Sequence, residues 1–223
     1  MKIKENLKHV EKTFRSYLGL NHHLVGVKLL KDGNDAEKHL QPNTPMAFCH
    51  MMRLSSTRGS KFLYSLEYER SLTAQVALGL RNIRHLKLSY RTVPPETRNI
   101  FISPLNENGI IPDVVLAIIS PKKMMDLATI IHAIKNKPVV AEFTGKHAYA
   151  EFFVRPYLDG EPGISFLCGG ARQVYSDYRD DEIIFGAPLE VYVQTAKTME
   201  RISKMGGKPL RLSDKRYTLH DNR

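Results

Sequence analysis

The sequence predicts an α/β domain with a mixed sheet that is covered mainly by helices. The segment 113–119 is apolar at every position from Val114 to Ile119, which is typical of a strand buried on both faces, usually beside parallel neighbours. Apolar residues recur at helical spacing in the segments 122–136 and 189–205. The 223 residues are 42% apolar and 25% charged, as expected for a folded globular chain.

The first part of the chain predicts alternating helices and strands. Leu7, Val10, Phe14 and Leu18 form one apolar stripe, which indicates an opening helix. Thr44-Pro45 supplies a capping hydroxyl and a proline for the start of a second helix. The predicted elements are a helix over 4–18, a strand over 24–30, helices over 46–56 and 71–80, and a strand over 62–66.

The second part continues the alternation around the strand 113–119. Leu86, Leu88 and Tyr90 alternate with polar residues, as in a strand with one wet face. Short apolar runs predict further strands over 86–90, 100–102, 139–143, 164–168 and 183–186, with helices over 122–136, 147–154 and 189–205.

We expect one domain over residues 1–205, followed by a flexible basic tail over 206–223. Two related halves are an alternative organisation. The helices that end at 58–61 and at 135–137 are each followed by a short strand, a turn and a small-residue helix, which holds Ala74 in one case and Ala148 in the other. An internal duplication is one explanation of this similarity. The other is that the same order of helices and strands arises often in unrelated sequences.

The charge of +10 is concentrated in the first part of the chain. Residues 1–98 contain 17 Lys and Arg against 8 Asp and Glu, which leaves 16 against 15 for the remainder. This asymmetry is compatible with an anionic partner and with a lysine-rich solvated surface.

The chain is predicted to be cytoplasmic. Its start carries no apolar run, and no stretch of about 18 apolar residues occurs, so we expect neither export nor membrane insertion. Cys49 and Cys168 are too sparse for a secreted disulfide framework. The sequence leaves the oligomeric state and the cofactor open.

The most pointed local motif is Cys168-Gly169-Gly170-Ala171-Arg172, at the end of a predicted strand. Two glycines allow a sharp turn that aims backbone amides at an anion, and a guanidinium is suited to carboxylate or phosphate. The alternative is a glycine turn with a buried cysteine and a surface arginine.

Cys49 lies at the start of a predicted helix, where the helix dipole would stabilise a thiolate. The alternative is an apolar packing role. The two cysteines have no spacing typical of a zinc site, so we predict no metal site from spacing. The segment 81–91, with three arginines and a lysine, is a candidate for contacts with nucleic acid or another polyanion, although no known nucleic-acid module accompanies it.

Several short motifs occur in a specific order along residues 5–203. They are Pro45-Met46-Ala47-Phe48-Cys49, Ser103-Pro104-Leu105, Pro112-Asp113-Val114-Val115-Leu116, Phe143-Thr144-Gly145, the Cys168 motif, and Asp181-Glu182-Ile183-Ile184-Phe185-Gly186-Ala187-Pro188. In this order the chain resembles the family catalogued as domain of unknown function 169, which occurs mainly in archaea and anaerobic bacteria.

The resemblance implies a shared pocket around Cys49, Gly145, Cys168, Gly170 and Arg172. It also implies further cysteines in the segments matching 69–71 and 148–150, where this chain has none. An iron–sulfur cluster or thiolate-bound metal would therefore lack two ligands here. Our first hypothesis is the binding of a small anionic ligand or cofactor by Cys49, Gly145, Cys168, Gly169, Gly170 and Arg172, and the alternative is a redox or metal-dependent enzyme that uses the two cysteines.

Overall fold

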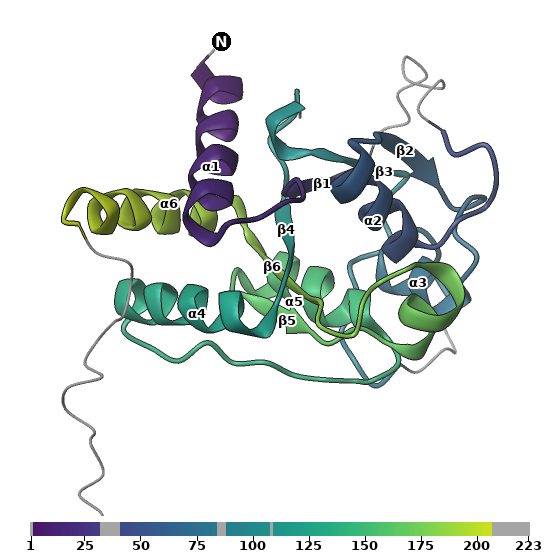
Figure 1. The fold of residues 1–223 in the computed structure, drawn as a ribbon. Coiled ribbons are helices and arrows are strands. Elements are labelled where there is room, and N and C mark those ends of the chain that lie inside the picture. Colours follow the sequence, from purple (N-terminus) through teal and green to yellow (C-terminus); the bar gives the residue numbers. More distant parts are fainter. Residues whose placement is uncertain (1, 32–40, 84–87, 108, 207–223) are drawn as a thin grey trace, which may run out of the picture.

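Helices and strands alternate along the chain (Figure 1). A computed structural model describes residues 2–31, 41–83, 88–107 and 109–206. The elements in order are α1 (Lys2–Leu18), β1 (Val25–Leu30), α2 (Phe48–Arg58), β2 (Phe62–Ser65), α3 (Leu72–Ala77), β3 (Asn99–Pro104), η2 (Leu105–Glu107), β4 (Val114–Ile119), α4 (Pro121–Lys135), η3 (Ala150–Val154), α5 (Arg155–Asp159), β5 (Gly163–Ser165), η4 (Gly170–Tyr175), β6 (Ile183–Pro188) and α6 (Leu189–Lys204).

The strands form one six-stranded sheet in the order β2-β3-β1-β4-β6-β5. Each pairing among the described residues is antiparallel, with Leu116 of β4 opposite Val25 on one side and Gly186 on the other. The predicted α/β fold with a helix-covered sheet is therefore confirmed, whereas the expectation of parallel neighbours is wrong. An apolar strand reports that both faces of the sheet are covered, and it does not report the direction of the adjacent strands.

Helices cover both faces of the sheet, and β4 shows why its sequence is apolar throughout. Val115, Ala117 and Ile119 belong to the core that packs against α1, α4 and α6. The alternate residues of β4 belong to the other core, which packs against α2, α3 and η3. Figure 1 shows these two groups of helices on opposite sides of the sheet.

The two halves of the sheet repeat one strand order. In the first half β1 pairs with β3 and β3 with β2, and in the second half β4 pairs with β6 and β6 with β5. The first strands of the halves, β1 and β4, pair at the centre. The predicted relation between two halves is confirmed by this arrangement.

The helices that correspond between the halves differ from the predicted ones. Helix α2 ends at Gly59, with φ of 73°, and α5 ends at Gly160, with φ of 69°; β2 and β5 each begin three residues later. By this spacing α2 corresponds to η3–α5. Helix α4 ends at Asn136 and leads into the segment 139–143, which is outside the sheet, so its predicted equivalence with α2 is wrong.

Three other predictions need correction. The segment 139–143 forms no strand, and its Val140 and Phe143 side chains are each 52% exposed. The predicted helix over 147–154 is present over 148–154, but residues 150–154 form a π-helix, which continues as α5. Thr44 does not cap α2, whose N-cap residue is Ala47; the Glu69 carboxylate accepts the Phe48 N–H at 2.9 Å instead.

Two of the predicted segments include residues that the structure does not describe. Leu86 and Lys87 of the predicted strand 86–90 lie outside the described residues, and 88–90 form no strand. All but the first residue of the tail 206–223 also lie outside the described residues. The boundary of a single domain at residue 205 stays a prediction. No helix within the described ranges is long and apolar enough to cross a membrane.

Candidate functional site

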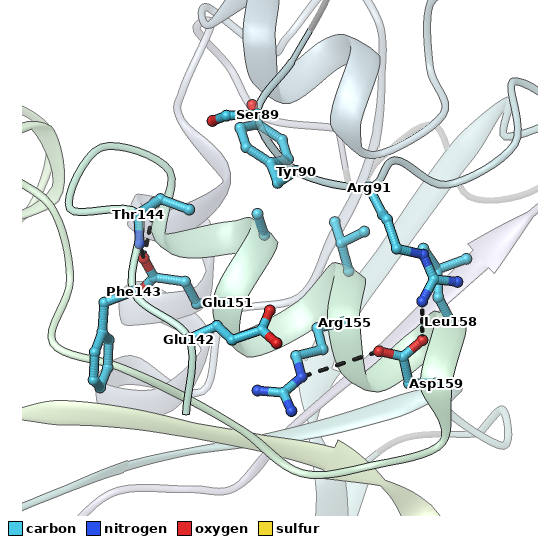
Figure 2. Close-up of a pocket in the computed structure, with 12 residues that line it drawn as sticks. Ser89, Tyr90, Arg91, Glu142, Phe143, Thr144, Glu151, Arg155, Leu158 and Asp159 are labelled. Atoms are coloured by element: carbon cyan, nitrogen blue, oxygen red, sulfur yellow. Dashed lines mark hydrogen bonds and ion pairs between the residues drawn. The ribbon is translucent and has the colours of Figure 1, made fainter. Parts of the chain in front are cut away.

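A pocket of about 370 Å³ lies where three segments of the chain meet (Figure 2). The segment before β3 contributes residues 89–91, the segment after α4 contributes 142–144, and η3 with α5 contributes the floor. Ligand pockets commonly have volumes of about 300–1,000 Å³, so this one is large enough for a small metabolite. Its lining residues are Ser89, Tyr90, Arg91, Glu142, Phe143, Thr144, Ala150, Glu151, Val154, Arg155, Leu158 and Asp159.

The floor of the pocket is a π-helix, a rare conformation that is frequent at functional sites. Its Glu151 is buried, at 5% exposure. The Glu151 carboxylate accepts hydrogen bonds from the Thr144 N–H and hydroxyl, from the Gly145 N–H at 3.3 Å and from the Ser165 hydroxyl. This buried acid therefore fixes the wall of the pocket to its floor and to β5.

Two arginines approach one carboxylate at the edge of the pocket. The Arg91 guanidinium bonds to Asp159, and the Arg155 Nε lies 4.0 Å from the Asp159 Oδ2 (Figure 2). Arg155 also donates to the Val140 carbonyl at 2.9 Å, and its side chain is only 17% exposed. Two guanidinium groups therefore share the single carboxylate of Asp159 at this end of the pocket.

Aromatic groups line the opposite part of the pocket. Phe143 is 52% exposed and packs against Phe166 with ring centroids 4.8 Å apart. The Tyr90 hydroxyl lies 3.3 Å from the Tyr149 hydroxyl, which donates to the Thr73 hydroxyl at 2.8 Å. Burial raises the pKa of Tyr149, so this chain of hydroxyls is neutral at physiological pH.

The structure brings Cys49 and Cys168 into one region. Both pack against the core formed by α2, α3 and η3, and they are close enough for their thiols to interact electrostatically. Burial raises the pKa of Cys49 to about 12, and its Sγ lies 3.9 Å from the Ser176 hydroxyl. Desolvation of the sulfur therefore favours the apolar packing role of Cys49 over a thiolate at the helix start.

Arg172 binds the protein's own backbone. Its guanidinium donates to the carbonyls of Phe166 at 2.9 Å, Glu182 at 2.7 Å and Arg179. These contacts hold the loop that leads from β5 to β6. Gly169 is the N-cap residue of η4, which begins at Gly170.

Gly145 lies beside the pocket, because its N–H shares the Glu151 carboxylate with Thr144, a lining residue. The predicted set is therefore divided. Gly145 adjoins the pocket wall, the two partly buried cysteines pack against the core formed by α2, α3 and η3, and Arg172 braces a separate loop. That all six residues bind one ligand stays a prediction.

Arg155 and Glu142 are lining residues that the sequence analysis did not single out. Glu151 has a sequence signal, because it is the only acid in the apolar run from Ala148 to Val154 and must find buried partners. Arg155 has no such signal, since a surface arginine next to a proline is ordinary. In the basic segment 81–91, Arg84 and Lys87 lie outside the described residues, and Arg91 is a pocket residue.

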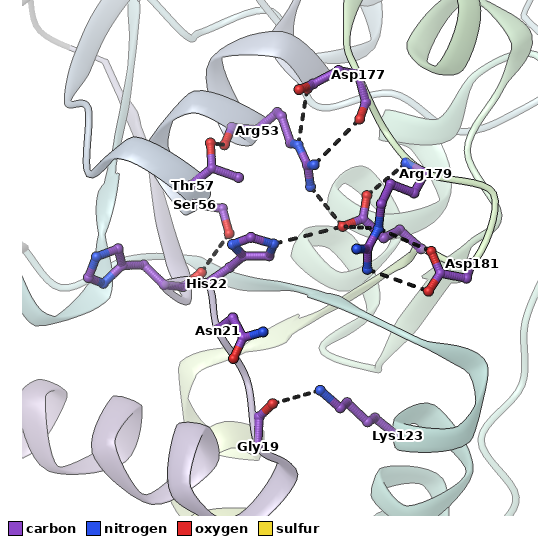
Figure 3. Close-up of polar contacts among 12 residues, drawn as sticks. Gly19, Asn21, His22, Arg53, Ser56, Thr57, Lys123, Asp177, Arg179 and Asp181 are labelled. Atoms are coloured by element: carbon purple, nitrogen blue, oxygen red, sulfur yellow. Dashed lines mark hydrogen bonds and ion pairs between the residues drawn. The ribbon is translucent and has the colours of Figure 1, made fainter.

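A second polar cluster joins the two halves without contributing to this pocket (Figure 3). Arg53 of α2 donates to Glu182 at 2.9 Å and to Asp177 at 3.2 Å, and its guanidinium lies 5.1 Å from the centre of the Tyr178 ring. Arg53 is 7% exposed and Glu182 is 3% exposed. A buried pair of this kind fixes α2 against the loop before β6.

The family model of domain of unknown function 169, described as uncharacterised ArCR, matches residues 13–92 and 84–198. The chain belongs to this family. No curated protein and no solved structure matches it. The first matched segment contains β1 and β2, and the second contains β3 together with β4, β5 and β6.

The positions that the resemblance associates with further cysteines in other family members come together in this chain. Ser71 bonds to Thr73 at 3.0 Å, and Thr73 accepts from Tyr149. The side chains do not fit a thiolate-bound metal or iron–sulfur cluster. Across the described ranges, no group of three or more His, Cys, Asp or Glu side chains could hold a metal ion.

Proposed function

We propose that this family member binds a small molecule in the pocket above η3, through an anionic group that pairs with Arg155 and Arg91. The observation that carries the proposal is the approach of both guanidinium groups to the single carboxylate of Asp159 at one end of the pocket. Arg is the residue best suited to a planar carboxylate or a phosphate, because its donors form a rigid fork.

Partial burial favours Arg155 as the principal partner. Its side chain is 17% exposed, whereas that of Arg91 is 67% exposed, so a contact with Arg155 is screened less by water. The Val140 carbonyl accepts from one nitrogen of Arg155, which fixes the guanidinium in orientation. A fixed donor loses less entropy when a ligand binds.

The ligand site proposed here adjoins the one expected from the sequence and is centred on a different arginine. Gly145 and Thr144 connect the two, since both donate to Glu151 under the pocket. Arg172 already donates to three carbonyl groups, so its guanidinium has little capacity for an anion.

The test compares Arg155→Gln with Arg98→Gln, which removes an exposed arginine outside the pocket. Thermal shift and calorimetry are carried out with phosphate, acetate, succinate, 3-phenylpropionate and phenylalanine. We expect at least one probe to bind the wild type and the Arg98 variant equally, and to bind Arg155→Gln about tenfold or more weakly. Equal affinity of all three proteins, or no binding of any probe, would refute the proposal.

Thiol chemistry is a second candidate function, favoured by the packing of Cys49 and Cys168 against the same core. The pKa of about 12 at Cys49 counts against it, because the thiolate is the reactive form. Anaerobic purification followed by metal analysis and thiol titration is the appropriate test. Two thiols that react only after unfolding, together with no bound metal, would remove this candidate.

A further inference from the structure

Glu142 is a pocket acid without a partner in the described part of the chain. Figure 2 shows its side chain extending into the space between Glu151 and Arg155. No hydrogen bond or ion pair joins the Glu142 carboxylate to another described residue.

The other two pocket acids are already engaged. Glu151 accepts from four donors in the 144–145 turn and β5, and Asp159 is shared by Arg91 and Arg155. The pocket therefore presents one carboxylate for a ligand, on the same side as an incompletely paired guanidinium. Such a pair of opposite charges complements a molecule that carries both signs.

We propose that the ligand is a zwitterion of the amino-acid class, whose ammonium group binds Glu142 and whose carboxylate binds Arg155. This inference rests on the proposed function of the same pocket. The ammonium and carboxylate of an α-amino acid lie on one carbon atom, so they suit an acid and an arginine that line the same pocket. Phe143, Val154 and Leu158 supply apolar surface for the remainder of the molecule.

The amine requirement provides specificity against simple acids. An acid without the amine leaves the Glu142 carboxylate unpaired beside a second negative charge, and this repulsion selects against it. An amine without a carboxylate leaves the Arg155 guanidinium without an anionic partner and places a second positive charge near it. Only a molecule with both groups satisfies the two ends together.

The experiment uses full-length protein and pairs of probes that differ only in the amine. The pairs are phenylalanine with 3-phenylpropionate, leucine with 4-methylpentanoate, and glutamate with glutarate. We expect the amino acid of at least one pair to bind wild-type protein about tenfold more tightly than its partner. Glu142→Gln is expected to reduce this preference to about twofold or less, while Glu67→Gln, an exposed acid outside the pocket, retains it.

The outcomes separate this inference from the proposed function. If both members of each pair bind equally, and Glu142→Gln changes neither, the zwitterion inference is overturned and the anion site stands, provided that Arg155→Gln weakens both. If no member of any pair binds, both proposals are overturned. Folding of each variant is checked by its unfolding temperature, and Glu142→Asp, which retains the charge, is expected to restore part of the preference.

Discussion

Gly163 of β5 lies directly opposite Gly186 of β6, and both glycines face the backbone of the π-helix. A Cβ atom at Gly186 would lie 1.7 Å from the Phe152 carbonyl oxygen, and one at Gly163 would lie 2.1 Å from the Glu151 carbonyl oxygen. The pocket floor therefore rests on a glycine pair that allows the helix to approach the sheet. Glu151 reaches Ser165 and the 144–145 turn from this position.

Replacement of Gly186 by alanine is expected to displace the π-helix and to destabilise the fold. Overpacking of a rigid backbone contact costs about 2–3 kcal/mol, which lowers the unfolding temperature by about 4–12 °C in a chain of this size. Gly169→Ala is the control, because the nearest atom to its added Cβ would be 3.8 Å away. Differential scanning calorimetry decides, and equal unfolding temperatures for the two variants would contradict the close approach.

Glu69 gives stability an unusual dependence on pH. Burial raises the pKa of this carboxyl to about 7, although the N–H groups of Ser71 and Phe48 bond to it. The folded state thus binds a proton that the unfolded chain releases near pH 4.5. Its contribution is complete below that pH and is lost as the pH rises toward 7, by about 3 kcal/mol.

The Glu69→Gln variant isolates this effect from the histidines. Burial lowers the pKa values of His22, His50 and His147, so these groups make stability rise with pH near pH 6. We expect the difference in unfolding free energy between wild type and variant to change in favour of the variant between pH 5 and pH 7. A difference that is constant over this window would mean that Glu69 is ionised throughout.

The Arg53–Glu182 pair is expected to be the most sensitive polar contact between the halves. Arg53→Met leaves the Glu182 carboxylate buried with its strongest partner removed, and such losses cost about 3–5 kcal/mol. Arg179→Met removes a 68% exposed arginine that lies 3.7 Å from the same carboxylate. We expect the second variant to lose less than about 1 kcal/mol in urea unfolding. Equal losses would show that the Arg53 pair is not a major source of stability.

The sequence alone predicted those helices and strands whose apolar residues recur with a regular local spacing. The stripe of Leu7, Val10, Phe14 and Leu18 lies on the buried face of α1, and each residue from Val114 to Ile119 is buried. The segment from Val139 to Phe143 is apolar except for Glu142 and remains outside the sheet. Strand propensity describes a fit to a half-buried surface, and no part of that segment pairs with a described strand.

The pocket could not be located from the sequence, because it depends on contacts between distant segments. Gly186 reads as an ordinary strand residue until the Phe152 carbonyl is known to face it. The sequence does not show that Arg155 and Arg91 lie close together, because this follows only from the contacts of both with Asp159. The composition of the motif Cys168–Arg172 predicts an anion site, but the Arg172 guanidinium donates to backbone carbonyl groups of the same loop.

Cys49 is expected to be unreactive in the folded protein. With a pKa of about 12, its thiol remains protonated at pH 8, so alkylation by iodoacetamide is expected to be at least about 100-fold slower than for a free cysteine. The rate is measured in Cys168→Ser protein by mass spectrometry of the modified peptide, with urea-unfolded protein as the reference. Labelling of the native protein at the unfolded rate would show that this sulfur is accessible and ionised.

Substitutions of Arg172 and of Arg155 are expected to affect different properties, stability in the first case and probe binding in the second. Arg172→Ala removes donors to the carbonyls of Phe166, Arg179 and Glu182, so it is expected to lower the unfolding temperature by about 3–8 °C. It is expected to leave the affinity of the pocket for the anionic probes within about twofold. Arg155→Gln is expected to show the reverse, with weak binding and little change in stability. Loss of probe binding in Arg172→Ala at an unchanged unfolding temperature would instead locate the anion at the glycine turn after Cys168.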